Sequence, residues 1–307
     1  MISKSKLSKL GIGAWGIGGF AQHDLNNNDE KQINTVVYQL EKGINFVEIN
    51  FWNSEGHSVE IITQAIKKAK ISRENLFYVQ AIYDYNNPTI KDVEKEFDRC
   101  LEKFETKYVD SLEFPLTSIF AYGFNNVTEL VKKYLSQGKI HHTSVTNFNL
   151  EYLQKYHQVF GDKLFSHELC YNFEIRENET LGITAYAQKH NILNVIYQPL
   201  RRNRTAKRNW PLLLELSKKY GRTQNQIILN WLASKNFYSL VKSENREHID
   251  ENLAAFEFTI DKIDLKKIDD FKVPNYKSPK IDWLMTGDGV KVHALPNEFD
   301  ELYPVVS

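Results

Sequence analysis

The sequence contains almost no cysteine. Only Cys100 and Cys170 occur among 307 residues, one in a helical stretch and one in an apolar stretch. Zinc sites and disulfide frameworks need cysteines at short, paired spacings, and no such spacing is present. We therefore expect two buried free thiols in a reducing compartment, and we assign no metal, because the histidines also lack ligand spacing.

Long apolar runs and a net charge are also missing. No segment approaches the roughly 20 apolar residues that a membrane-spanning helix needs, and the start, "MISKSKLSKLGIGAWG", lacks the apolar core of a signal peptide. Lys+Arg and Asp+Glu both number 39, so no overall field favours nucleic acid or an anionic membrane. We expect a cytoplasmic protein with a small-molecule ligand, and the sequence does not indicate an oligomeric state.

Short apolar runs alternate with helical patterns along nearly the whole chain. The predicted strands cover residues 9–15, 44–49, 76–82, 108–114, 139–145, 164–171, 192–200 and 236–241. Predicted helices cover residues 29–41, 58–70, 89–104, 127–136, 180–190 and 246–256, with others from residue 150 and across 210–234. Eight such units are typical of a (β/α)8 TIM barrel of the α/β class. We predict one domain over residues 1–307, with 274–307 as a tail over the barrel.

In such a barrel the chemistry lies at the C-terminal ends of the strands and in the loops that follow them. Three carboxylates are expected there: Glu48, Glu168, and Glu113, which lies two residues before Pro115 and so on the same side of its strand. The sequence places no obvious cation beside them. This pattern indicates shared-proton chemistry, a cation site, or a strand register that differs from the predicted one.

Eight segments, in order, resemble the aldo/keto reductases. They are "LGIGAWGIGG", "GINFVEINFWNSEGHSVEII", "TKYVDSLEF", "QGKIHHTSVTNFN", "ELCYNFEIR", "VIYQPL", "KKYGRTQNQIILNWL" and "KSENREHIDENLAAFEF", and the resemblance spans residues 9–271. The resemblance implies an NADP(H) or NAD(H) cofactor extended across the barrel mouth. It also implies carbonyl reduction by a tetrad of Asp, Tyr, Lys and His, in which the tyrosine hydroxyl protonates the alkoxide.

The tetrad positions carry different residues in this chain. By the resemblance, the aspartate falls on Glu48, the tyrosine on Asn53, the lysine on Ala81 and the histidine on Pro115. An asparagine amide is no proton donor of useful acidity, and alanine supplies no cation to tune one. Loss of the general acid alone lowers a rate about a hundred- to ten-thousand-fold. We therefore expect that the standard carbonyl reduction is lost.

The cofactor positions, by the same resemblance, are largely retained. They comprise the pair that holds the nicotinamide carboxamide, the aromatic under the nicotinamide ring, the phosphate pair and the adenine contacts: Thr146, Asn147, Tyr197, Lys242, Ser243, Glu251 and Asn252. Glu168 replaces a glutamine that grips the carboxamide, and His248 replaces an arginine that favours a 2′-phosphate. The loop of residues 201–203 is arginine-rich, and its arginines either clamp a pyrophosphate or fill the groove.

Other residues near the strand ends have simpler explanations. His57 opens a helix, and a helix-start role is favoured over a catalytic one. Five aromatics would line an apolar pocket if they converge: Trp15, Phe51, Trp52, Tyr83 and Tyr85. A hydroxyl of Tyr83 or Tyr85 is a candidate for an acid that has migrated from the family position.

Three functions remain open. The first is a repurposed small-molecule enzyme that binds a nicotinamide nucleotide and performs redox chemistry on an activated bond, or an elimination or isomerisation, with Glu48. The second is a catalytically inactive nucleotide-binding protein that acts as a sensor or scaffold subunit. The third is a conventional NADPH-dependent reductase with migrated catalytic residues.

Overall fold

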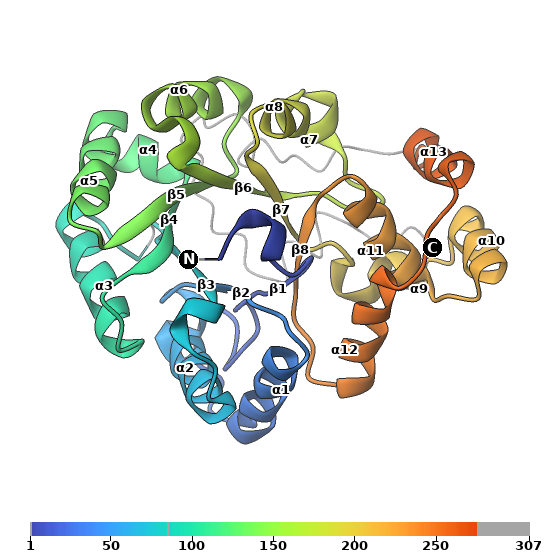
Figure 1. The fold of residues 1–307 in the computed structure, drawn as a ribbon, viewed down its shortest axis with the longest axis horizontal. Coiled ribbons are helices and arrows are strands. Elements are labelled where there is room, and N and C mark those ends of the chain that lie inside the picture. The colour runs from blue at the N-terminus through green and yellow to red at the C-terminus, as the bar shows by residue number, and fades with distance from the viewer. Residues whose placement is uncertain (1, 85, 275–307) are drawn as a thin grey trace.

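The barrel is closed by eight parallel strands. The computed structural model describes residues 2–84 and 86–274, and within them each strand pairs with the next and β1 pairs with β8 (Figure 1). The strands are β1 (Leu10–Ile12), β2 (Phe46–Ile49), β3 (Phe77–Ala81), β4 (Val109–Pro115), β5 (Ile140–Thr146), β6 (Leu164–Cys170), β7 (Leu193–Tyr197) and β8 (Tyr238–Val241). The predicted (β/α)8 barrel is thereby confirmed.

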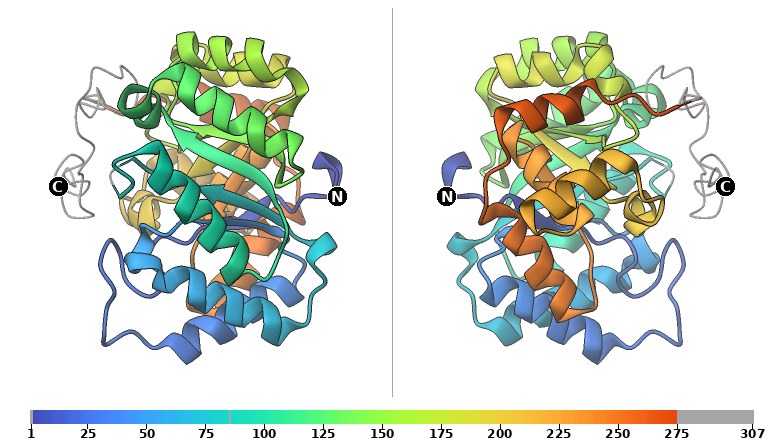
Figure 2. Two further views of the ribbon diagram at one scale, coloured as in Figure 1. Left: turned by 90° about the vertical axis from the view of Figure 1, so that its left-hand side faces the viewer. Right: turned by 90° about the vertical axis from the view of Figure 1, so that its right-hand side faces the viewer.

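Helices surround the barrel, as the end-on view of Figure 1 and the side views of Figure 2 show. They are α1 (Asp29–Glu41), α2 (His57–Ala69), α3 (Ile90–Lys103), α4 (Leu116–Tyr122), α5 (Phe124–Ser136), α6 (Leu150–Phe160), α7 (Glu177–Thr180), α8 (Ile183–Lys189), α9 (Arg204–Lys207), α10 (Pro211–Tyr220), α11 (Gln224–Ser234), α12 (Arg246–Leu253) and α13 (Lys262–Asp270). Each long helix packs one apolar stripe against the outer face of the strands. The strands are therefore buried on that face as well.

One predicted helix differs from the structure, and α4, α9 and α13 were not predicted. The helix predicted over 180–190 is divided into α7 and α8, because Gly182 adopts φ 74°, a left-handed conformation that interrupts the helical turn. Helix α4 was not predicted, since it follows β4 directly, with Pro115 as its N-cap. The predicted tail begins at residue 274, and from residue 275 it lies outside the described part of the chain.

The barrel interior is layered. Aromatic rings fill its lower part, which is the part at the N-terminal ends of the strands. There Phe77 stacks on Phe165 with 4.2 Å between ring centroids and on Phe46 with 5.8 Å. One layer higher, the hydroxyl of Ser144 lies 2.7 Å from those of Ser111 and Ser166. Alternate residues of a strand face the same side, so Glu48, Glu113 and Glu168 follow as the next inward layer. The apolar bottom thus supports a polar upper layer.

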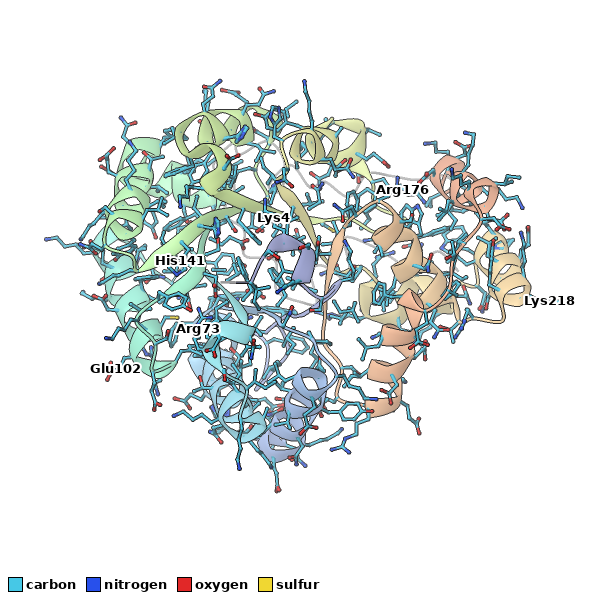
Figure 3. The ribbon with its side chains drawn as sticks, viewed as in Figure 1. Lys4, Arg73, Glu102, His141, Arg176 and Lys218 are labelled. Atoms are coloured by element: carbon cyan, nitrogen blue, oxygen red, sulfur yellow. The ribbon has the colours of Figure 1, made fainter. Side chains whose placement is uncertain are left out.

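The N-terminal segment closes the lower end of the barrel. The short turn η1 (Lys4–Lys6), dark blue beside the N label, lies across this end (Figure 2). Leu7 packs with the interior aromatics. Lys4 lies near the barrel axis in Figure 3, and its ammonium group is 5.0 Å from the centroid of the Phe165 ring. Arg73 and His141 lie to one side of the same end in that view. A ligand must therefore enter from the opposite end.

Both cysteines are buried free thiols, as predicted. Cys100 lies on α3 and Cys170 ends β6. Burial raises the pKa of Cys170 to about 12, so its thiol stays protonated at neutral pH. Within residues 2–84 and 86–274, none of the helices has the length and apolar character required to cross a membrane.

Candidate functional site

One cavity of about 810 Å³ opens at the C-terminal ends of the strands. Its wall contains residues from the C-terminal half of each of the eight strands or from the loop that follows it, which is where a barrel of this type carries its ligand. The structure brings twelve of the thirteen predicted site residues to this wall: Glu48, Asn53, Pro115, Thr146, Asn147, Glu168, Tyr197, Lys242, Ser243, His248, Glu251 and Asn252.

Ala81 is the exception. It ends β3, is fully buried and pairs in register with Glu113, but its methyl group is too short to form part of the cavity wall. A long side chain at this position would extend toward the carboxylates, and alanine leaves them without such a partner. Ala81, which the family resemblance places at the lysine position, therefore lies behind the cavity wall.

Glu48 is held by neutral donors. The side-chain amide of Asn50 donates to Oε1 over 2.8 Å, and the Ala14 backbone N–H donates to Oε2 over 3.4 Å. The side-chain oxygen of Asn50, Oδ1, in turn accepts a hydrogen bond from the Asn53 backbone N–H. Burial raises the pKa of the Glu48 carboxyl, and the two hydrogen bonds offset only part of this effect.

Glu113 and Glu168 form a carboxyl pair beside Glu48. A hydrogen bond joins their side chains, which requires that one of them be protonated. Burial and the neighbouring carboxylates raise the pKa of both groups well above the ordinary value. The second oxygen of Glu113, Oε1, is buried and has no hydrogen-bond partner in the described part of the chain. The predicted acidic cluster therefore exists, and burial shifts its carboxyls toward their protonated form.

The charges acting on these three carboxyls come from one another. In the described ranges, no lysine or arginine lies close enough to contribute to their ionisation. Burying a carboxylate without a neighbouring cation costs free energy, and such a group usually becomes protonated. The cluster can thus release or accept protons, and it can also accept a cation that comes from outside the chain.

A neighbouring part of the wall matches a primary carboxamide. The Tyr197 hydroxyl donates to Asn147 Oδ1 over 3.0 Å, which turns the Asn147 amide nitrogen into the available donor. The Glu168 backbone carbonyl accepts from the Asn147 N–H and the Thr146 hydroxyl, at 2.9 and 3.1 Å. An Asn147 donor beside the Glu168 carboxyl acceptor complements the oxygen and nitrogen of a carboxamide.

The far end of the cavity is basic. The Lys242 ammonium forms an ion pair with Glu244, and the Ser243 hydroxyl donates to the Asn245 carbonyl over 3.1 Å. The Arg202 guanidinium, which also belongs to the cavity wall, lies 5.2 Å from the centroid of the Phe20 ring. Lysine and arginine at one end and carboxyls at the other give the cavity two ends of opposite character.

Arg201, an arginine of the 201–203 loop, has a buried acidic partner. Its guanidinium is 5% exposed and forms an ion pair with the buried Glu174, whose other oxygen accepts from the Trp210 indole N–H over 2.7 Å. Arg201 therefore fixes the loop between β7 and α9, and it also lines the cavity. Arg202 and Asn203, which adopt positive φ values, complete that part of the wall.

The predicted adenine contacts, Glu251 and Asn252, lie in the last turn of α12. Glu251 accepts from the Thr223 hydroxyl over 2.7 Å, and the Glu251 carbonyl accepts from the Gln226 amide over 2.9 Å. His248 and Asn252 are the other predicted residues of this region of the wall. Helix α12 is thus tied to the first turn of α11.

Three of the five predicted aromatics converge on the cavity. Trp15 stacks on Trp52 at 4.9 Å between centroids, and Trp52 meets the edge of Tyr83 at 6.4 Å. Phe51 instead faces α3, where the Arg99 guanidinium lies 4.5 Å from its ring centroid. Tyr85 lies outside the described residues, so the prediction for it stays untested.

His57 begins α2 and lies away from the cavity, as the helix-start interpretation expects. Its Nε2 lies 2.6 Å from an Asp29 carboxylate oxygen and its Nδ1 lies 3.3 Å from Glu60. The ring also stacks on His23 at 3.8 Å. These contacts join α1, α2 and the loop after β1.

Some wall residues were missed by the sequence analysis. Thr117 on α4 lines the cavity, and so do Thr223, Gln224 and Asn225 at the start of α11. The pattern "TQNQ" forms a capping box, in which Thr223 and Gln226 satisfy each other's backbone N–H groups. That motif identifies a helix start, and only the closed barrel brings this start to the cavity.

Comparison with known sequences identifies the family. The profile described as "Aldo/keto reductase family" matches residues 9–272. Methylglyoxal reductase DkgA of Escherichia coli O157:H7 is 24% identical over 270 residues, which are 85% of this chain and 88% of that protein. The NADPH-dependent alpha-keto amide reductase of Saccharomyces cerevisiae is 28% identical over 179 residues, or 54% of this chain and 57% of that protein.

Solved structures agree with this result. A thermostable aldo-keto reductase crystallised with the inhibitor epalrestat superposes with a TM-score of 0.75 at 28% identity, covering 86% of this chain and 94% of that one. An aldo-keto reductase from Klebsiella pneumoniae in complex with NADPH gives a TM-score of 0.72 at 18% identity, covering 89% and 93%. With a family profile that matches most of the chain and a closed barrel of the same fold, the protein belongs to the aldo/keto reductase family.

Proposed function

We propose that this protein is an NADP(H)-dependent oxidoreductase that reduces an activated bond of a small molecule, with the Glu48 carboxyl as the proton donor. The observation that carries the proposal is the single cavity that joins a carboxamide-complementary wall, a basic end and a buried, protonatable carboxyl cluster. Relatives named as NADPH-dependent or crystallised with NADPH support the choice of nucleotide.

The residues of the cavity fit a nicotinamide nucleotide at both ends. Asn147 and Glu168 present a donor and an acceptor to the carboxamide, and Tyr197 offers a ring beside them. Lys242 and Ser243 would hold a phosphate on the adenosine side, and Glu251 and Asn252 would contact the adenine. Bound NADPH supplies a hydride equivalent.

Burial favours the protonated form of Glu48, which is the form that can give a proton. The short bond from Asn50 makes Oε1 the carbonyl-like oxygen, so the proton belongs on Oε2, where the Ala14 contact is long. Burial keeps that proton in place until a substrate atom accepts it. Asn50 then stabilises the resulting carboxylate, and Glu113 and Glu168 hold a proton close by.

Nucleotide titration tests the first half of the proposal. Quenching of the protein's fluorescence by NADPH and NADH should give saturable binding, tighter for NADPH. Lys242→Met and Tyr197→Ala should each weaken NADPH binding about tenfold, or about 1.4 kcal/mol, because each removes a direct contact. Glu151→Gln, on the exposed face of α6, is the control and should change nothing. If neither NADPH nor NADH binds, the proposal is refuted.

Turnover separates the proposal from a non-catalytic role. The replacements at Asn53, Ala81 and Pro115 favour, as a second candidate, a nucleotide-binding protein without catalysis. Glu48→Gln should keep NADPH affinity within about twofold but lower the rate of NADPH oxidation about a hundredfold or more, because an amide cannot donate the proton. If NADPH binds and no activated C=N, C=C or C=O compound is turned over, the second candidate is correct.

A further inference from the structure

The substrate region of the cavity has the features of a site for a cation. Glu48 and Glu168 line the cavity and are each 6% exposed. Within the ranges 2–84 and 86–274, no basic side chain contributes to their ionisation. The lysine and arginines of the cavity belong to its other end, after β7 and β8. A positive group brought by a ligand would therefore meet carboxyls that have no cationic partner at the end formed by Glu48 and Glu168.

A buried, unpartnered oxygen supports the same conclusion independently of the wall. Glu113 is 1% exposed, its Oε1 has no hydrogen-bond partner among the described residues, and its carboxyl interacts with those of Glu48 and Glu168. An unsatisfied buried oxygen costs free energy, so it indicates a missing donor. A cation at the adjacent carboxyls would supply donors and lower the repulsion among the three groups.

Two tryptophans are joined to Glu48 through its own hydrogen-bond partners. The backbone N–H of Ala14 binds Glu48, and Trp15 is the next residue. Asn50 also binds Glu48, and its carbonyl oxygen fixes the loop that carries Trp52. The indole rings stack at an interplanar angle of 11° and line the cavity. Aromatic faces beside carboxylates are a recognition element for organic cations.

We propose that the substrate is an imine or related small molecule with a basic nitrogen, bound as a cation between the carboxylates of Glu48 and Glu168 and the indole rings of Trp15 and Trp52. This inference rests on the proposed function and narrows its activated bond to C=N. A carbonyl substrate would bring no charge to the same region.

The chemistry balances without a further reactant. The Glu48 carboxyl transfers its proton to the imine nitrogen, which leaves a carboxylate paired with an iminium cation. Hydride from NADPH then adds to the iminium carbon, the C=N π electrons become the nitrogen lone pair, and the products are an amine and NADP⁺. Solvent returns a proton to Glu48. The ion pair stabilises the charge that exists before hydride transfer.

A matched pair of probes tests the charge requirement. Dihydroisoquinoline carries a basic imine nitrogen that can take the proton of Glu48, and tetralone is a neutral ketone of nearly the same shape. Calorimetry on the NADP⁺-loaded protein should give at least tenfold tighter binding of dihydroisoquinoline. Glu48→Gln and Glu168→Gln should reduce this preference to below threefold, and Glu151→Gln should keep it. Equal binding of the two probes, or an unchanged preference in both glutamine variants, would overturn the inference.

A second variant guards against misfolding of the glutamine variants. Ala81→Lys places a tethered ammonium beside Glu113, its register partner, and should abolish the preference, whereas Ala81→Met adds similar bulk and should retain it. Retention by Ala81→Lys would contradict the inference. NADPH titration of the same samples separates the two proposals, because nucleotide binding without cation preference rejects only the inference. Cation preference without nucleotide binding rejects the proposed function.

Discussion

At the residue scale, Glu48 is held by an amide and a backbone N–H rather than by a cation. This arrangement explains why its pKa is raised, because burial acts on a charge that no lysine or arginine offsets. The same reasoning applies to Glu113 and Glu168, whose shared hydrogen bond requires a proton. Three residues thus supply a proton store inside the barrel.

The proton store has a measurable cost. Glu113 in the folded protein keeps its proton above the ordinary pKa of 4.5, whereas the unfolded chain releases it there. Its contribution to stability is therefore fully present below pH 4.5 and is lost as the pH rises toward its folded-state pKa. Glu113→Gln cannot ionise, so its stability relative to the wild type should rise with pH, by at most about 1.4 kcal/mol per pH unit.

Thermal unfolding from pH 4 to pH 9 measures this difference. The control, Glu151→Gln, changes an exposed ion pair with Lys155 and should shift stability by a small amount that does not follow the same pH dependence. A difference between Glu113→Gln and the wild type that stays flat, or falls with pH, would show that Glu113 is not held in its protonated form.

At the element scale, the order of strands and helices could be predicted from the sequence because hydrophobic periodicity is local. The pattern of β2 and its polar C-terminal loop identified Glu48 and Asn53, and both line the cavity. It could not place α4 or the start of α11 at the site, since barrel closure brings them there. The sequence also could not show that Arg201 pairs with the buried Glu174, because only the folded loop brings these two side chains together.

Helix α11 carries a prediction of its own. Thr223 caps this helix, and its hydroxyl donates to Glu251 of α12 over 2.7 Å. Thr223→Ala should lower the free energy of unfolding by about 1 kcal/mol, because it removes the cap and the contact between the two helices. Thr223→Ser keeps the hydroxyl and should recover most of the loss in a urea titration. Equal stability of the alanine variant and the wild type would show that the cap contributes nothing.

At the scale of the whole molecule, the barrel has one closed end and one working end. The N-terminal segment lies across the lower end (Figure 2). Aromatic rings fill the barrel interior next to it. The upper end holds a cavity with basic residues after β7 and β8 and carboxyls on β2 and β6, and Glu113 of β4 is buried beside these carboxyls. In our account the nucleotide side of the family's site is kept, and proton transfer has moved to buried carboxyls.

The most direct test of this account is transfer of deuterium from nicotinamide-deuterated NADPH to a dihydroisoquinoline substrate, followed by mass spectrometry of the amine. We predict deuterium at the former C=N carbon with the wild-type protein, and a rate about a hundredfold or more lower with Glu48→Gln. Bound NADPH that transfers no deuterium, or a Glu48→Gln variant as fast as the wild type, would contradict the assignment of Glu48 as the proton donor in a reductase.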